Sequence, residues 1–286
     1  MNVLMVGATG EFAGLVLPEL KKRDIEVYAL IHDRNQSPEV KRKGADYVIL
    51  GDLNDPASLR AATEGMDGVF HINPGFAENE AKMGLQMVRA AEMNDVEKFV
   101  FSAVYHPSLP LVNHAGKRPV EEALYKSNMK FVILQPAMFM QMIGMRWSQI
   151  KKNGVITQPY SPRSKVSYVD YRDVAEAAGK AFVDDALDYG TFELSAPGMV
   201  THVHVAQILS HLADMEIKAR KISFNDFADQ ANITDPFRRQ GMETMFDSYD
   251  RYGFHGGNSL VLESVLGRQP HTLRQYLREM VENHDG

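Results

Sequence analysis

A glycine-rich segment near the start of the chain, residues 7–14 (GATGEFAG), has the spacing of a dinucleotide-binding loop. Gly7 would allow a tight turn, and Gly10 would let a pyrophosphate approach the bare backbone. The small residues 13 and 14 would let the following helix lie close to a sheet, with its free N–H groups facing the anion. We therefore expect dinucleotide binding here. The alternative is a turn with only a structural role.

Two opposite charges follow the second apolar run, about 20 residues beyond the glycines. At this position dinucleotide-binding proteins distinguish the 2′-hydroxyl of NAD from the 2′-phosphate of NADP. Asp33 would hold the 2′-hydroxyl of NAD, whereas Arg34 would accept the 2′-phosphate of NADP. Because Lys41 and Arg42 lie nearby, NADP is the expected cofactor and NAD the alternative. Arg34 could also be a solvated loop charge.

Two further segments are expected to line the same site. Asp52 and Leu53 follow the third apolar run and are placed to lie beside the adenine, unless they only lead into a helix capped by Asp55. The turn after the fourth run would pass under the nicotinamide, or be a plain turn. The cofactor contacts expected from these segments are Gly7, Thr9, Gly10, Glu11, Phe12, His32, Arg34, Asp52, Leu53, Ile72, Asn73 and Pro74.

Short apolar runs alternate with amphipathic stretches through the first 135 residues. Runs of four or five residues rich in Val and Ile are typical of strands buried on both faces. The stretches between them place apolar side chains on one helix face. This pattern predicts an α/β fold with a doubly wound parallel sheet (Rossmann) and a ligand crevice at the carboxyl ends of its strands. The runs are residues 3–6, 27–31, 47–50, 68–72, 99–102 and 131–134.

The pattern changes after Pro136. A methionine-rich helix is predicted from Ala137 to about Gln149, and mostly helical patterns follow from about Thr201, ending in a helix that begins near Thr272. We expect a Rossmann domain that binds NAD(P) in residues 1–150, with a returning segment near 166–195. Residues 151–286 would form a smaller, discontinuous, mostly helical C-terminal domain that binds substrate.

Composition excludes several classes of function. The 286 residues include no cysteine, which excludes thiol catalysis and thiolate metal sites and suits a reducing compartment, so a cytoplasmic location is expected. A net charge of -6 gives no basic field for nucleic acid. No apolar run reaches the ~18 residues of a membrane span, and we expect neither a signal peptide nor an anchor. The histidines match no metal-ligand spacing, so no metal is expected at His202, His204 or His211.

Beyond the glycine loop, six motifs follow one another along the chain: Gly51-Asp52-Leu53, Phe99-Val100-Phe101-Ser102, Lys117-x-x-x-Glu121, Leu134-Gln135-Pro136, Tyr168-Val169-Asp170-x-x-Asp173 and Leu266-Gly267-Arg268-Gln269-Pro270. Together they carry a resemblance to a known family. With its glycine loop, the chain resembles the NmrA-like branch of the atypical short-chain dehydrogenase/reductases. That resemblance implies an NAD(P)-binding Rossmann domain, a small C-terminal substrate domain and a cleft between them, and it adds Lys117 and Pro136 to the expected cofactor contacts. Members include quinone and related reductases and also redox-sensing regulators.

The catalytic residues implied by the resemblance are incomplete. In ordinary short-chain dehydrogenases a serine and a Tyr-x-x-x-Lys motif manage proton transfer. Ser102 and Lys117 match, but Asn113 stands where the tyrosine should be, and an amide donates no proton. Tyr105 or His114 could substitute if their loop folds inward. A quinone needs less help, because solvent can protonate the hydroquinone anion.

Structural alternatives exist for these residues as well. Lys117 could pair with Glu121 at i,i+4, and Ser102 could be a simple strand-end hydroxyl. Methionine adapts to flat apolar ligands, although core packing is the alternative for most methionines after Pro136. The residues expected to contact substrate are Asn113, Phe139, Met140 and Gln141.

Three functions follow from the sequence. An NAD(P)H-dependent oxidoreductase that reduces a quinone-like or other apolar acceptor by hydride transfer is favoured, since Lys117 is retained beside an apolar segment. The first alternative is a non-catalytic redox sensor that binds a partner protein. The second is an isomerase or lyase with a tightly held cofactor. A small-molecule substrate is the expected partner, and a homodimer is left open.

Overall fold

The computed structural model describes residues 1–285, with side chains through residue 283. The chain forms two compact units. The first contains Met1–Pro136 and Tyr171–Glu193, and the second contains Ala137–Asp170 and the chain from Leu194 onward. The chain therefore leaves the first unit at Pro136 and returns to it at Tyr171. The assignment of cofactor binding to one unit and substrate binding to the other stays a prediction.

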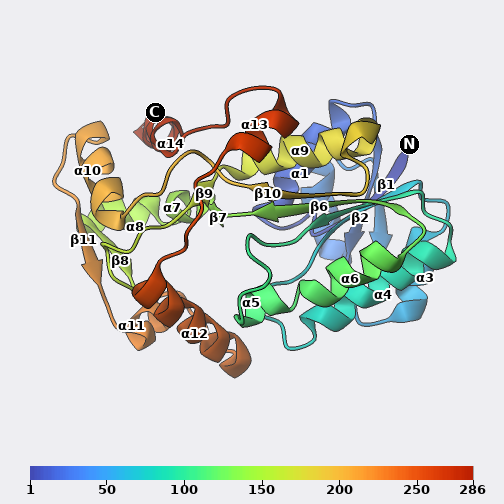
Figure 1. The fold of residues 1–286 in the computed structure, drawn as a ribbon, viewed down its shortest axis with the longest axis horizontal. Helices are drawn as coiled ribbons and strands as arrows, with labels where there is room; N and C mark the ends of the chain where they lie inside the picture. Colours follow the sequence, from blue (N-terminus) through green and yellow to red (C-terminus); the bar gives the residue numbers. More distant parts are fainter. Residues whose placement is uncertain (286) are drawn as a thin grey trace. The chain divides into compact units, whose positions relative to one another are not determined.

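The first unit is built on a seven-stranded sheet in the order β10-β6-β5-β4-β1-β2-β3 (Figure 1). Strands β1 to β6 pair in parallel, as the unbroken apolar runs predict for strands covered on both faces. The doubly wound fold is confirmed, and the direction of winding reverses between β1 and β4. The strands are β1 (Asn2–Val6), β2 (Glu26–Ile31), β3 (Tyr47–Leu50), β4 (Gly68–Ile72), β5 (Lys98–Ser102), β6 (Lys130–Pro136) and β10 (Gly190–Leu194).

Helices cover both faces of this sheet. One layer contains α3 (Pro56–Thr63), α4 (Glu80–Met93) and α6 (Arg118–Lys126), and the other contains α1 (Val16–Lys21) and α9 (Tyr171–Val183) (Figure 1). Right-handed crossovers between parallel strands produce this two-sided arrangement. The shorter helices of the unit are η1 (Ala13–Leu15), η2 (Arg34–Gln36), α2 (Ser37–Arg42), α5 (Val112–Ala115) and η3 (Asp185–Leu187).

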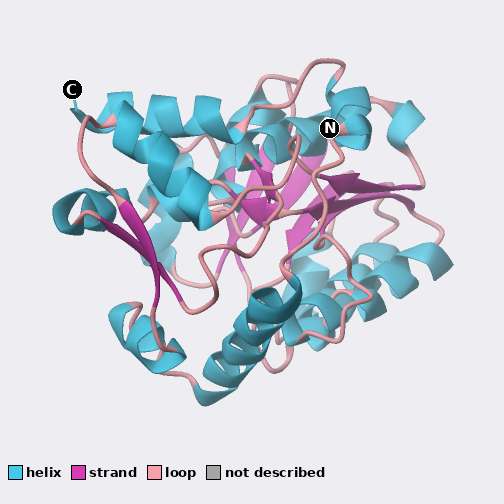
Figure 2. Ribbon diagram, turned by 60° about the vertical axis from the view of Figure 1, so that its left-hand side comes forward, coloured by secondary structure: helices cyan, strands magenta, loops and turns pink. Residues whose placement is uncertain are grey.

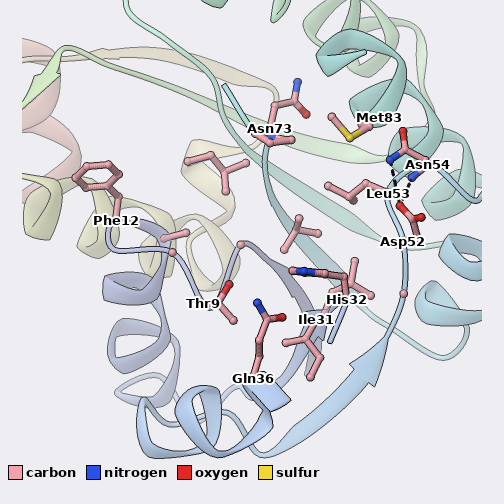
Figure 3. A pocket seen from close by; sticks show the side chains of 18 residues that line it. Thr9, Phe12, Ile31, His32, Gln36, Asp52, Leu53, Asn54, Asn73 and Met83 are labelled. Atoms are coloured by element: carbon pink, nitrogen blue, oxygen red, sulfur yellow. Dashed lines mark hydrogen bonds between the residues drawn. The ribbon is translucent and has the colours of Figure 1, made fainter. Parts of the chain in front are cut away.

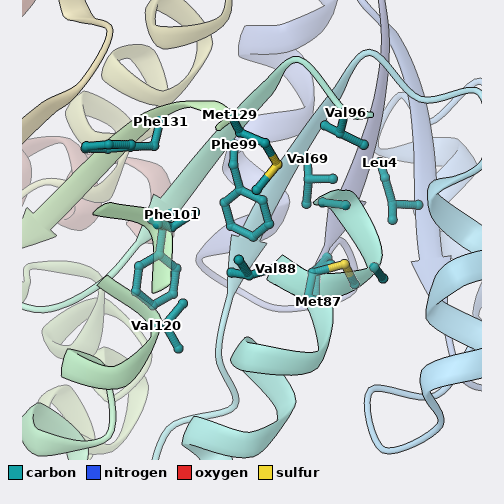
Figure 4. Packing of buried hydrophobic residues seen from close by; sticks show 14 of the residues in the cluster. Leu4, Val69, Met87, Val88, Val96, Phe99, Phe101, Val120, Met129 and Phe131 are labelled. Atoms are coloured by element: carbon teal, nitrogen blue, oxygen red, sulfur yellow. The ribbon is translucent and has the colours of Figure 1, made fainter. Parts of the chain in front are cut away.

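The core beneath α4 fixes the central strands in register. Leu4, Val69 and Phe99 come from β1, β4 and β5, and they pack against Met87 and Val88 of α4 with almost no exposure (Figure 4). Burial of a side chain of this size contributes about 1.5–3 kcal/mol. The loops at the carboxyl ends of β1 and β4 therefore start from a rigid base.

The second unit consists mainly of helices with two small parallel sheets (Figure 2). Strand β7 (Met138–Phe139) pairs with β9 (Tyr168–Val169), and β8 (Val155–Gln158) pairs with β11 (Lys218–Lys221). No helix among the described residues is long and apolar enough to cross a membrane. Its helices are α7 (Gln141–Gly144), α8 (Trp147–Asn153), α10 (His202–Leu212), α11 (Phe224–Gln230), α12 (Pro236–Tyr252), α13 (Leu260–Leu266) and α14 (Leu273–Asp285).

The single methionine-rich helix predicted after Pro136 is wrong. Its first residues form β7, because Met140 N donates to the Val169 carbonyl over 2.9 Å and the chain before it pairs with residues 167–169. The rest is divided between α7 and α8, and α8 ends before Gly154, which has a φ of 62°. Pairing with a distant segment overrides local helix propensity here.

Candidate functional site

A cleft of about 490 Å³ opens at the carboxyl ends of β1, β2, β3 and β4 in the first unit (Figure 3). This is the edge at which doubly wound sheets bind ligands, next to the reversal between β1 and β4. The structure gathers ten of the residues predicted from sequence along its lining: Gly7, Thr9, Gly10, Phe12, His32, Asp52, Leu53, Ile72, Asn73 and Pro74. Gly51, which precedes Asp52 and Leu53 in the segment expected beside the adenine, also lines the cleft. The lining residues that were not among the expected contacts are Val6, Ala13, Leu30, Ile31, Gln36, Asn54 and Met83.

The glycine loop closes on itself at one end of this cleft. Gly7 has a φ of 82°, and a Cβ added there would lie 2.7 Å from Cγ2 of Ile72. The Gly10 N–H donates to the Gly7 carbonyl over 2.8 Å, and the Gly14 N–H donates to the Gly10 carbonyl over 3.0 Å. The result is a turn of bare backbone followed by a helical turn, which is the form of a phosphate cradle.

A lysine that the sequence reasoning missed lies against this loop. Lys43 Nζ donates to the Thr9 carbonyl over 3.2 Å and also pairs with Glu39 at 2.7 Å. Lys43 directly follows α2, and it can reach the loop because the strand before this helix, β2, is the neighbour of β1 in the sheet. The basic run at residues 41–43 was the available sequence signal. Lys43 adds positive charge beside the backbone donors.

The two charged residues after β2 have different surroundings. The Asp33 carboxylate caps the turn η2 by accepting from the Asn35 N–H over 2.9 Å. Neither Asp33 nor Arg34 belongs to the lining of the cleft, and Arg34 is exposed, whereas Gln36 does line it. The carboxylate that would select NAD is therefore already engaged in local structure.

A buried pair supports the cleft at the end of β4. His71 Nε2 and Asn73 Oδ1 lie 2.5 Å apart, and both side chains are buried. Burial lowers the pKa of His71 to about 4, so the ring is neutral near pH 7. A Cβ on Gly84 of α4 would lie 2.8 Å from Asn73 Oδ1, so the glycine allows the helix to pack closely on this pair.

Ser102 is paired with a tyrosine that the sequence did not identify. Its Oγ lies 3.2 Å from the hydroxyl of Tyr171, the first residue of α9, and both side chains are fully buried. Burial raises the pKa of Tyr171 to about 12, while the hydrogen bond with Ser102 lowers it. The Tyr171 ring also lies 5.8 Å from that of Phe12, which lines the cleft. An aromatic residue at the start of the returning segment was the only sequence signal.

Lys117 lies outside the lining of the cleft, in a buried ion pair with Glu80 of α4. Glu80 also accepts the Phe76 N–H over 3.1 Å, so the pair holds the loop between β4 and α4. The alternative that paired Lys117 with Glu121 is wrong. Glu121 instead accepts from Gln135 over 2.8 Å, and burial raises the pKa of Glu121.

The loop after β5 turns its two candidate proton donors into the protein. Tyr105 is buried beside the ring of His106, and burial raises its pKa. His114 is fully buried, its Nδ1 lies 3.1 Å from the His106 carbonyl, and burial lowers its pKa to about 4. Neither residue lines the cleft, and Asn113 is half-buried on α5.

The remaining predicted contacts are dispersed. Glu11 is exposed, and Pro136 is buried with its carbonyl accepting the Tyr105 N–H, so neither lines the cleft. In the second unit, Met140 is fully buried, which favours the core-packing alternative, and Phe139 is half-buried in β7. Gln141 donates to Asp170 over 2.7 Å. Among the described residues no group of three potential metal ligands was found.

Comparison with known proteins gives consistent results. NAD(P)H azoreductase of Xenophilus azovorans is 27% identical over 76% of this chain and 75% of that protein. The solved structure of Citrobacter sp. triphenylmethane reductase with NADP(H) superposes with a TM-score of 0.84 at 20% identity, covering 97% of this chain and 99% of that one. The NADPH-dependent quinone oxidoreductase of Escherichia coli, solved with NADPH, gives 0.82 at 19% identity, covering 99% and 100%.

The structural likenesses, all at low sequence identity, establish the fold. The family is established by the sequence itself, because the model of the NmrA-like family matches residues 1–282. That match includes the glycine loop, the β4 turn that carries Asn73 and the returning segment that carries Tyr171. This chain belongs to the NmrA-like family.

Proposed function

We propose that this protein is an NAD(P)H-dependent oxidoreductase that reduces a quinone-like or other apolar small-molecule acceptor by hydride transfer. The observation that carries the proposal is the cleft at the carboxyl ends of β1 to β4, one end of which is the bare glycine loop. Membership of the NmrA-like family and the azoreductase relative support the same activity.

The residues of the cleft fit a dinucleotide. The backbone from Gly7 to Gly10 would hold the pyrophosphate, with Lys43 adding charge beside Thr9. The segments after β2 and β3 would hold the adenosine. NADP is the better fit, because Asp33 is occupied as a helix cap while Arg34 extends into solvent near the same strand end.

The chemistry needs little from acidic side chains. A bound NADPH supplies a hydride at its nicotinamide, and the acceptor gains that hydride and one proton. The neutral His71 keeps Asn73 in place at the cleft over the ordinary pH range, and the Glu80 pair holds the neighbouring loop. With Tyr105 and His114 outside the lining, water is the proton source we propose for a stabilised product anion.

The test is NADPH oxidation followed at 340 nm with a panel of acceptors: benzoquinones, naphthoquinones, azo dyes and triphenylmethane dyes. We expect acceptor-dependent oxidation with at least one class, faster with NADPH than with NADH. Tight NADPH binding without turnover on any acceptor would contradict the proposal. It would favour the alternative of a redox sensor, which the buried Lys117 and the asparagine at position 113 would suit.

A further inference from the structure

A second cavity, of about 310 Å³, lies wholly within the second unit. It is bordered by α8, by β8 and by the last residue of α11, which Figure 1 shows grouped together. Cavities of this size hold small organic molecules. The lining consists of Arg146, Gln149, Ile150, Asn153, Val155, Thr157 and Gln230.

One face of the α8 segment supplies most of this lining. Positions 146, 149, 150 and 153 follow the i, i+3, i+4, i+7 spacing that places side chains on one side of a helix. The polar members are Arg146, Gln149 and Asn153, and Gln230 adds a third side-chain amide from another element. The apolar members of the lining are Val155 and the buried Ile150. The lining therefore combines apolar side chains with several hydrogen-bond donors.

The guanidinium of Arg146 is held in a fixed orientation. Its two terminal nitrogens donate to Thr157, to the carbonyl over 2.8 Å and to Oγ1 over 2.9 Å. Its Cζ lies 5.4 Å from the centre of the Phe227 ring, in cation–π distance. An arginine positioned by two hydrogen bonds and a ring loses little freedom when it binds an oxyanion.

No acid among the described residues balances the charge of Arg146. The lining contains no Asp or Glu, and no carboxylate of the described residues forms an ion pair with this half-buried guanidinium. Burial accordingly lowers its pKa. Both bonds to Thr157 go to neutral oxygens, and three of the five N–H donors have no acceptor within residues 1–283. A half-buried charge without an acidic partner carries a desolvation cost, which an anionic ligand would offset by pairing with it.

We infer that this cavity is a binding site for a small organic anion, whose carboxylate or phosphate group pairs with Arg146 and whose polar body contacts Gln149, Asn153 and Gln230. The site is separate from the glycine loop and does not depend on the proposed reductase activity. The three amides accept as well as donate hydrogen bonds, so the ligand body can carry hydroxyl or amide groups.

The experiment is isothermal titration calorimetry of the full chain with sodium succinate and, separately, inorganic phosphate, against sodium chloride at equal ionic strength. We expect saturable binding of at least one oxyanion and none of chloride. The Arg146→Gln variant should bind at least 10-fold more weakly. The matched control is Arg251→Gln, which removes an exposed arginine outside the cavity and should bind as the wild type does.

Phosphate could also bind at the glycine loop, but that binding would be unchanged in Arg146→Gln. Asn153 is exposed, so Asn153→Leu keeps the fold and the cation while removing one polar contact, and we expect a several-fold loss of affinity. The oxyanion whose binding weakens in Arg146→Gln is the one that the site takes. No saturable binding of either anion, or equal affinities of the wild type and Arg146→Gln, would overturn the inference.

Discussion

The hydroxyl groups of Ser102 and Tyr171 lie 3.2 Å apart in the interior of the first unit, although 69 positions separate them in the chain. They join the end of β5 to the start of α9, and the Tyr171 ring continues to Phe12 at the cleft. The pair therefore couples the returning segment of the chain to the candidate cofactor site.

Replacing Tyr171 by Phe should keep the ring contact with Phe12 and remove the bond to Ser102. A buried hydroxyl left without a partner costs about 1–3 kcal/mol, so we expect a loss of unfolding free energy in that range. Urea denaturation of Tyr171→Phe, Ser102→Ala and the double variant would measure it. The double variant should be less destabilised than the sum of the two single variants, and strict additivity would show that the bond contributes nothing.

Replacing Gly7 by Ala should abolish tight cofactor binding. The new Cβ would lie 2.7 Å from Ile72 at a φ of 82°, so the loop must move away from its present course. We expect NADPH affinity, measured by quenching of protein fluorescence, to fall at least about 10-fold. Gly75→Ala is the matched control, since nothing lies within 4 Å of its added Cβ and its φ is not positive. A similar loss in both variants would contradict the explanation.

Breaking the buried ion pair should be costly, whichever partner is removed. Lys117→Met leaves Glu80 as an isolated buried carboxylate, and Glu80→Gln leaves an isolated buried ammonium, so each should lower the unfolding free energy by about 3 kcal/mol. Thermal unfolding of both variants and of the double variant provides the measurement. The double variant should recover part of the loss. Lys126→Ala breaks the exposed pair with Glu122, and a loss there as large as for Lys117→Met would show that burial is irrelevant.

Stability should fall as the pH decreases from 6.5 toward 4. His71, His114 and His202 have pKa values lowered to about 4, in each case mainly by burial, while the unfolded chain takes up protons near pH 6.5. Between these pH values the unfolded state binds more protons than the folded state. The free energy of unfolding should therefore fall by about 2 kcal/mol per histidine between pH 7 and pH 5. The measurement is the unfolding free energy in urea at both pH values.

In His71→Phe, the change in unfolding free energy between pH 7 and pH 5 should be smaller than in the wild type by the contribution of one histidine, about 2 kcal/mol. Asn73→Ala, which removes the hydrogen-bond partner but keeps the histidine, should not reduce it. An unchanged difference in His71→Phe would show that His71 is not the buried neutral group that its surroundings require.

Cofactor selectivity should depend on Arg34. If its guanidinium binds the 2′-phosphate, Arg34→Ala should lower NADPH affinity about 10-fold and leave NADH affinity unchanged, because such charged hydrogen bonds contribute about 1.5–3 kcal/mol. Arg42→Ala removes an exposed arginine of α2 as a comparison. Binding titrations with both nucleotides measure the effect. An equal loss of NADPH affinity in the two variants would indicate a general effect of charge.

The sequence by itself determined the elements of the first unit and one end of its cleft. The apolar runs of β1 to β6 and the glycine loop are local signals, because an unbroken apolar run and a turn that needs glycine are both visible in neighbouring positions. Burial is not local: β3 forms as predicted, but it is the edge strand, and Tyr47 and Leu50 are exposed. The methionine-rich segment shows the limit of such signals, since pairing with Val169 turned its first residues into a strand.

Only the tertiary structure decided the partners of the site residues. Lys117 pairs with Glu80, 37 positions away, instead of Glu121, and Lys43 contacts Thr9, which lies 34 positions away in the chain. Tyr171 meets Ser102 only after the chain has left the first unit and returned. Helical and strand periodicity specify which face a side chain occupies, but they carry no information about which distant segment packs against that face.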